Sequence, residues 1–204
     1  MITASVRFLR CGRAAALQLG LVAILAGCVT SPPTQLYTLA PQPAASGSSA
    51  PPRAQRSSET IAVKPVALPK YLDRPQVVRF RAPYELTAAD YERWAENLDD
   101  IVTRVLIADL AARLPRSNVV ASSGPLTMPA DATVEVDVRR FDAEPGRSVV
   151  LTAQWIVRRE KKPGRLRSEE IRIPAATDST PDLVAAMSDA LGQLSDRIAV
   201  TIAE

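Results

Sequence analysis

Residues 132–173 read ATVEVDVRRFDAEPGRSVVLTAQWIVRREKKPGRLRSEEIRI and carry the clearest strand pattern in this sequence of 204 residues. Valines alternate with polar residues in the first part, which is typical of a strand with one buried face. Pro145-Gly146 and Pro163-Gly164 supply the residue types that tight turns need. The stretch predicts an antiparallel meander of three strands, over residues 132–141, 148–159 and 165–173.

Two amphipathic helices are predicted outside the meander. The first covers residues 87–114, where Thr87 is a candidate N-cap, apolar residues recur at helical spacing from Leu98, and Pro115 ends the pattern. The second begins near Thr180, with a capping hydroxyl, Pro181 in the first turn and an apolar stripe beyond it.

Shorter strands complete the predicted order. They cover residues 35–40, 60–67, 76–81 and 118–122. The order β-β-β-α-β-β-β-β-α predicts an α+β domain, in which a mixed, largely antiparallel sheet carries two amphipathic helices packed on one face.

The N-terminus predicts export and lipidation. Three arginines precede an uncharged apolar run over residues 14–26, which is the pattern of a signal peptide and shorter than the roughly 20 residues of a membrane-spanning helix. The run ends in Leu25-Ala26-Gly27-Cys28, which matches the lipobox of bacterial lipoproteins. We expect cleavage between Gly27 and Cys28, with an S-diacylglycerol and an N-acyl group on Cys28. The alternative is a buried helix with an accidental cysteine.

Three segments follow from this interpretation. Residues 1–27 form the cleaved signal peptide, residues 28–58 a lipidated tether with the short strand 35–40 and a disordered Pro/Ala/Ser/Gly-rich linker, and residues 59–204 the folded domain. The sequence leaves open whether strand 35–40 pairs with its own domain or with a neighbour in a homo-oligomer. Val29, rather than Asp, follows the cysteine, so we expect attachment to the outer membrane, facing the periplasm.

The charge balance gives no indication of nucleic-acid binding. The formal net charge of +3 comes from 25 basic and 22 acidic residues, and removal of residues 1–27 takes away three arginines and no acid. The mature chain is therefore formally neutral and lacks the basic excess typical of nucleic-acid-binding domains.

The composition argues against an enzyme. The chain has no histidine, and its two cysteines are Cys28 and Cys11, which lies in the predicted signal peptide. The usual general base, zinc ligand and thiol nucleophile are therefore missing, and no cofactor or metal is expected beyond the lipid on Cys28. The acidic pairs Asp99-Asp100 and Glu169-Glu170 are interpreted as solvated surface charges. The basic residues between Arg158 and Arg167 could contact anionic lipid or an acidic partner, or could simply be a solubilising hairpin.

Four motifs carry a resemblance to a known family. They are Tyr37-Thr38-Leu39, the run from Ile61 to Val66, the run from Leu68 to Val78, and Arg93-Trp94-Ala95-Glu96. In this order, behind a lipobox, they resemble the PqiC/YmbA-like lipoproteins, which are auxiliary components of ABC-type transport systems that contain MCE proteins. That family tends to have Pro-Leu after the last motif, whereas Asn97-Leu98 follows here, and Asn97 can cap the helix instead.

The resemblance implies a periplasmic lipoprotein that docks an MCE-domain protein and helps hydrophobic molecules cross between membranes. The candidate contact residues are Tyr37, Thr38, Leu39, Tyr71, Leu72, Arg74, Pro75, Tyr84, Trp94 and Glu96. For Trp94, a place in the core is the alternative. Two other functions stay open, a lipid-carrying domain and a structural lipoprotein of envelope assembly. The aromatic content of 4% gives little sign of a large lipid cavity.

Overall fold

The computed structural model describes residues 32–44, 59–125, 128–160 and 163–204. Residues 34–204 form one compact unit. The predicted signal peptide, Gly27, Cys28, most of the predicted linker and the lysine pair 161–162 lie outside the described residues.

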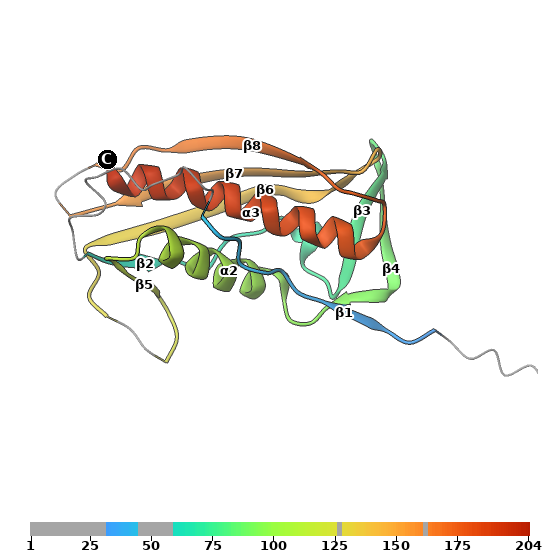
Figure 1. Cartoon of the computed structure of the whole chain (residues 1–204), viewed down its shortest axis with the longest axis horizontal. Coiled ribbons are helices and arrows are strands. Elements are labelled where there is room, and N and C mark those ends of the chain that lie inside the picture. Colours follow the sequence, from blue (N-terminus) through green and yellow to red (C-terminus); the bar gives the residue numbers. More distant parts are fainter. Residues whose placement is uncertain (1–31, 45–58, 126–127, 161–162) are drawn as a thin grey trace, which may run out of the picture. The chain divides into compact units, whose positions relative to one another are not determined.

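The predicted meander is confirmed and forms one side of the sheet, with β8 at the edge (Figure 1). Its strands are β6 (Ala132–Glu144), β7 (Ser148–Arg158) and β8 (Arg167–Pro174), paired antiparallel in sequence order. Val134 and Val136 lie opposite Val157 and Trp155, and all four side chains are buried. A register shift between Val138 and Arg140 changes which residues face inward, so that Phe141 becomes the next core residue.

The turns of the meander differ from each other. Gly146 adopts a φ of 94°, in the left-handed range that a Pro-Gly turn requires. Gly164 has no such positive φ, so the second Pro-Gly pair does not adopt the turn conformation of the first.

The other strands extend the sheet from the opposite edge of β6. They are β1 (Gln35–Tyr37), β2 (Thr60–Val63), β3 (Gln76–Ala82), β4 (Glu85–Trp94) and β5 (Asn118–Ala121). Within the described ranges, the sheet has eight strands. Six of them are neighbours in the order β1-β4-β3-β6-β2-β5, while β7 pairs with β6 and β8 pairs with β7. The β1–β4, β2–β5, β2–β6 and β3–β6 pairs are parallel. The sheet is therefore mixed, as predicted, and β1 pairs with β4 of its own chain.

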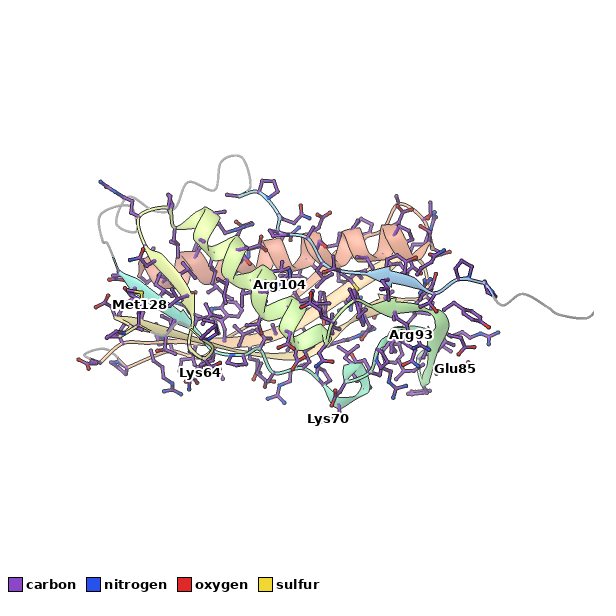
Figure 2. All side chains as sticks on the ribbon, turned by 90° about the horizontal axis from the view of Figure 1, so that it is seen from below. Lys64, Lys70, Glu85, Arg93, Arg104 and Met128 are labelled. Atoms are coloured by element: carbon purple, nitrogen blue, oxygen red, sulfur yellow. The ribbon has the colours of Figure 1, made fainter. Side chains whose placement is uncertain are left out.

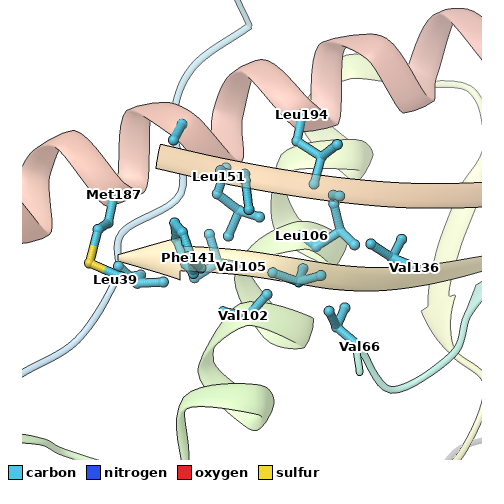
Figure 3. Close-up of a cluster of buried hydrophobic side chains, with 14 of the residues drawn as sticks. Leu39, Val66, Val102, Val105, Leu106, Val136, Phe141, Leu151, Met187 and Leu194 are labelled. Carbon is cyan, nitrogen blue, oxygen red and sulfur yellow. The ribbon is translucent and has the colours of Figure 1, made fainter. Parts of the chain in front are cut away.

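Two helices, α2 (Leu98–Arg113) and α3 (Thr180–Ala203), cover one face of this sheet (Figure 1). Pro181 lies in the first turn of α3, as predicted. The cap lies one residue earlier than the predicted Thr180, because the Ser179 hydroxyl accepts a hydrogen bond from the Asp182 N–H. Figure 3 shows Leu106 and Leu194 of the two helices in one cluster with Val136 and Leu151 of the sheet. The core therefore lies between the helix pair and the meander.

The predicted helix over residues 87–114 is wrong in its first half, which forms strand β4. Ala82 pairs with Glu85 across a tight hairpin, and Leu86 pairs with Phe80. The apolar stripe starts only at Leu98, so residues 87–97 have no helical face to bury and gain more from pairing with β3. Asn97 is the N-cap residue of α2, although its side chain makes no capping hydrogen bond.

The predicted strand over residues 60–67 is also shorter in the structure. The ladder ends at Val63, two residues before Pro65, which has no N–H to donate. The chain still follows β6, because the Ala67 N–H donates to the Val136 carbonyl at 3.2 Å. A 3-10 turn at Lys70–Leu72 then leads into β3.

Among the described helices, none is both long enough and apolar enough to span a membrane.

Candidate docking site

Parts of three of the four family motifs meet at the β1–β4 edge of the sheet, whereas the run from Ile61 to Val66 begins in β2, between β5 and β6. Tyr37 of β1 is the register partner of Trp94 of β4. The Ala95 N–H donates to the Tyr37 carbonyl at 2.8 Å, and the Trp94 N–H donates to the Pro75 carbonyl at 2.7 Å. We call this meeting point the motif junction, and it consists of residues 37–39, 71–75 and 94–96.

Burial divides the motif junction into a base and an accessible rim. Leu39, Leu72 and Trp94 are at most 5% exposed. Their side chains belong to the core, which for Trp94 agrees with the alternative interpretation given above. The rim consists of the exposed residues Thr38, Arg74, Pro75 and Glu96, with Tyr37 half-buried. A partner could therefore touch the rim but not Trp94.

Tyr71 fixes the motif segment to the sheet. Its hydroxyl donates a hydrogen bond of 2.6 Å to Oδ2 of Asp142, a residue that is only 1% exposed. Burial and the neighbouring carboxylate raise the pKa of Tyr71. Arg140 donates to the same carboxylate and lies over the Phe80 ring at 5.0 Å from its centroid. Tyr71 therefore positions residues 71–75, and its hydroxyl is occupied within the domain.

Two open hollows flank the motif junction. The larger, about 580 Å³, lies between β1, β4 and the start of α3 and is lined by polar groups that include Arg79 and Glu92. Arg79 donates to the Asp178 carbonyl at 2.7 Å, to Glu92 at 3.1 Å and to the Thr180 hydroxyl. The smaller hollow, about 350 Å³, lies between residues 66–74 and the start of α2. Because a guanidinium and a carboxylate line the larger one, it suits a polar contact better than an acyl chain.

The β3–β4 hairpin exposes large apolar side chains between its tip and the end of β4 that joins the motif junction. Tyr84, at the tip, has a relative accessibility of 101%. Leu86 and Tyr91 of β4 are also exposed, and so is Leu36 on the neighbouring strand β1. We call these four residues the exposed hairpin surface. Figure 2 shows the same strand carrying the charged residues Glu85 and Arg93, so apolar and charged groups lie side by side there, as in many protein contact surfaces.

Sequence reasoning singles out Tyr84 but misses the other three residues of the exposed hairpin surface. The helix predicted over residues 87–114 begins between Leu86 and Tyr91, so the sequence does not place the two residues on one strand. The available signal was Tyr84 and Leu86 at strand spacing, with no apolar stripe following at helical spacing.

Three arginines of the basic cluster between Arg158 and Arg167 are paired within the domain. Arg158 contacts Glu135 at 3.2 Å, Arg159 contacts Glu59 at 3.2 Å, and Arg167 contacts Glu204 at 2.5 Å. These ion pairs support the interpretation of a solubilising hairpin.

Solved structures share this fold. A crystal structure of an uncharacterized protein matches with a TM-score of 0.70 at 23% identity, covering 84% of this chain and 99% of that one. A crystal structure of a Xanthomonas campestris protein matches with a TM-score of 0.64 at 16% identity, covering 81% and 93%. At these identities the likeness concerns the fold alone.

The sequence places the chain in a family. The model of the ABC-type transport auxiliary lipoprotein component family matches residues 37–199, so the chain belongs to this family of transport auxiliary lipoproteins. Among its relatives is the intermembrane transport lipoprotein PqiC of Escherichia coli K12, which is 28% identical over 117 residues. PqiC of Shigella flexneri matches equally. The match covers 55% of this chain and 61% of each PqiC. The resemblance predicted from the motifs is confirmed.

Proposed function

We propose that this chain is a non-enzymatic, lipid-anchored component of an ABC-type system that moves lipids or other hydrophobic molecules between the inner and outer membranes, and that it docks the MCE-domain protein of that system. The observation that carries the proposal is the family match, because it runs from β1 through the motif junction into α3. The name of PqiC, an intermembrane transport lipoprotein, supports the same process.

The proposed anchor is Cys28, with residues 1–27 removed, residues 28–58 serving as the tether and residues 59–204 as the docking domain. The lipobox Leu25-Ala26-Gly27-Cys28 supports lipidation. Val29 in place of Asp supports the outer membrane, with the domain in the periplasm. Several acyl chains on one residue attach a protein stably to a membrane, whereas a single acyl chain binds only marginally.

The proposed docking region combines the rim of the motif junction with the exposed hairpin surface. Tyrosine side chains are enriched among the residues that dominate protein interfaces, because they bury a large apolar ring and keep a hydroxyl for hydrogen bonding. Tyr84 and Tyr91 are exposed while Trp94 is buried, so the two tyrosines replace Trp94 as the aromatic contacts.

Site-specific photo-crosslinking in cells that contain the native transport system tests this proposal. A photoreactive amino acid replaces Tyr84 or Leu86 in the full chain, and matched controls carry it at Leu166 or Val200, which are exposed apolar positions outside the proposed region. We expect a crosslink to an MCE-domain protein from positions 84 and 86 but not from the controls. Crosslinks from positions 166 or 200 alone would move the docking surface elsewhere. Bound lipid without an MCE partner would favour the lipid-carrier alternative.

A further inference from the structure

The segment after β1 lies between the two helices like a bound peptide. Residues 38–43, which we call the strap, run between α2 and α3 (Figure 1). The Leu39 side chain is 2% exposed and lies beside Met187 and Phe141 (Figure 3). This leucine is the only residue of the strap that is buried, so apolar contact alone explains little of how the rest is held.

After its apolar anchor Leu39, the strap is held by main-chain hydrogen bonds to both helices. The Ala40 N–H donates to the Ser188 hydroxyl at 3.2 Å. The Gln42 N–H donates to Oδ1 of Asp109 at 2.7 Å, and the Gln42 carbonyl accepts from Nη1 of Arg113 at 3.1 Å. Because every peptide carries these groups, the site recognises an extended backbone rather than the side chains of residues 40 and 42.

Asp109 and Arg113 are buried charges, with side chains 0% and 3% exposed. Burial raises the pKa of Asp109. Arg113 contacts Asp196 at 2.6 Å and the Gly192 carbonyl at 2.9 Å, and the Ser195 hydroxyl donates to Asp109. Buried charges are costly unless they are paired and hydrogen-bonded. With the strap bound, Gln42 completes the pairing of Asp109 and Arg113, which α3 supplies in part through Ser195 and Asp196.

Because Gly192 has no side chain, the strap can pack closely against α3 at this position. A Cβ atom at this position would lie 2.7 Å from the Cβ of Gln42 and 3.2 Å from its Cγ. Glycine destabilises a helix interior relative to alanine, and the close approach of Gln42 accounts for its presence here.

We propose that α2 and α3 form a backbone-reading peptide site whose ligand is the strap of the same chain, and that this site is a latch setting the length of the membrane tether. The second half rests on the proposed lipidation of Cys28. With strap and β1 bound, the chain from Cys28 joins the domain near Thr34, and a chain of this length reaches at most about 20 Å. With both released, it joins the domain at Glu59 and reaches at most about 110 Å. The bound latch keeps the docking domain near its membrane with its docking region complete. Release lets the domain reach further into the periplasm, but withdraws Leu36, Tyr37 and Thr38 from that region.

Amide hydrogen exchange of the full chain tests the latch. Gln42→Pro removes the N–H that donates a hydrogen bond to Asp109, whereas Gln42→Ala keeps this N–H. We expect exchange at Ala40 to rise about tenfold or more in Gln42→Pro, the loss typical of a hydrogen bond to a charged group, and to stay near wild type in Gln42→Ala. Equal protection in wild type and Gln42→Pro would overturn the latch.

A size-swap pair separates the latch from general damage to α3. Gly192→Ala should raise amide exchange at Ala40 as Gln42→Pro does, although alanine favours the helix. Gln193→Ala, at the exposed neighbouring position, should leave this exchange unchanged. Combining Gly192→Ala with Gln42→Gly removes the Cβ that clashes and should restore protection of Ala40. If this double variant is as exposed as Gly192→Ala alone, steric exclusion of the strap is wrong.

Fluorescence energy transfer measures the distance between the domain and the membrane. The lipidated chain, labelled at an introduced Leu166→Cys, is placed on vesicles of phosphatidylethanolamine and phosphatidylglycerol that contain an acceptor lipid. We expect a longer mean distance to the membrane in Gln42→Pro than in Gln42→Ala, and equal distances would overturn the control of tether length. A chain that never joins the vesicles would refute the proposed anchor, while the exchange experiment would still decide on the latch.

Discussion

At the residue scale, one buried carboxylate connects the family motif to the sheet. Asp142 accepts hydrogen bonds from Tyr71 at 2.6 Å and from Arg140 at 2.9 and 3.0 Å. We predict that Tyr71→Phe destabilises the domain by about 1–2 kcal/mol, because a buried acceptor loses a donor that no solvent replaces. Urea unfolding measures the change, with Tyr84→Phe at the exposed hairpin tip as the control. A loss of equal size in both variants would contradict the role given to Asp142.

Glu144 makes the stability of the domain depend on pH. Burial opposes its charged form, yet hydrogen bonds from Arg140 and Arg172 outweigh it and lower the pKa of Glu144 from the usual 4.5. A carboxyl with a lowered native pKa stabilises the fold above its unfolded pKa, and this contribution is lost as the pH falls through the native value. Glu144→Gln should therefore cost about 0.5–1 kcal/mol at pH 7.

The pH series provides the check on Glu144. The difference in unfolding free energy between wild type and Glu144→Gln should shrink progressively as the pH falls below 4.5. Glu160→Gln, at an exposed position, controls for the loss of one carboxylate. A difference that stays constant down to the lowest pH at which the domain folds would show that Glu144 acts through packing rather than charge.

At the element scale, the β6–β7 turn depends on its glycine. Gly146 has a φ of 94°, with open space where a Cβ would stand, so only backbone strain opposes a side chain. We predict that Gly146→Ala costs about 1–2 kcal/mol, the penalty of a left-handed conformation for a residue with a Cβ. Gly146→Asn should lose less, since asparagine tolerates positive φ better. Thermal unfolding of both variants measures this, and equal losses would argue against a conformational cause.

The elements that the sequence predicts correctly are those with a strong period. The meander alternates polar and apolar residues, and α2 and α3 carry helical stripes from Leu98 and Leu183, so each pattern has one solution that buries an apolar face. Strand β4 has no such pattern. Ala88 and Ala89 favour a helix, and only pairing with β3, which a local pattern cannot reveal, makes these residues extended.

At the scale of the whole molecule, the motifs of the candidate site were visible in the sequence, but their meeting was not. Nothing in Tyr37 or Trp94 alone shows that β1 pairs with β4. Asp109 and Arg113 did leave a signal, because both fall on the buried stripe of α2, three residues beyond Leu106 and Leu110. Charged residues in a buried stripe need partners, and here the partners are groups of α3 together with the chain's own strap.

The anchor and the fold should be separable in the whole molecule, because Cys28 lies outside the compact unit of residues 34–204. We predict that Cys28→Ser abolishes attachment to membranes, since each buried methylene of an acyl chain contributes about 0.8 kcal/mol to binding. The unfolding free energy of the domain should stay within about 0.5 kcal/mol of wild type, the usual range for changes away from packed sites. Fractionation after a high-salt wash and urea unfolding give the two measurements, and Cys11→Ser in the predicted signal peptide is the matched control. If the Cys28→Ser chain stays with the membranes while Cys11→Ser behaves identically, something other than a lipid on residue 28 holds this protein there.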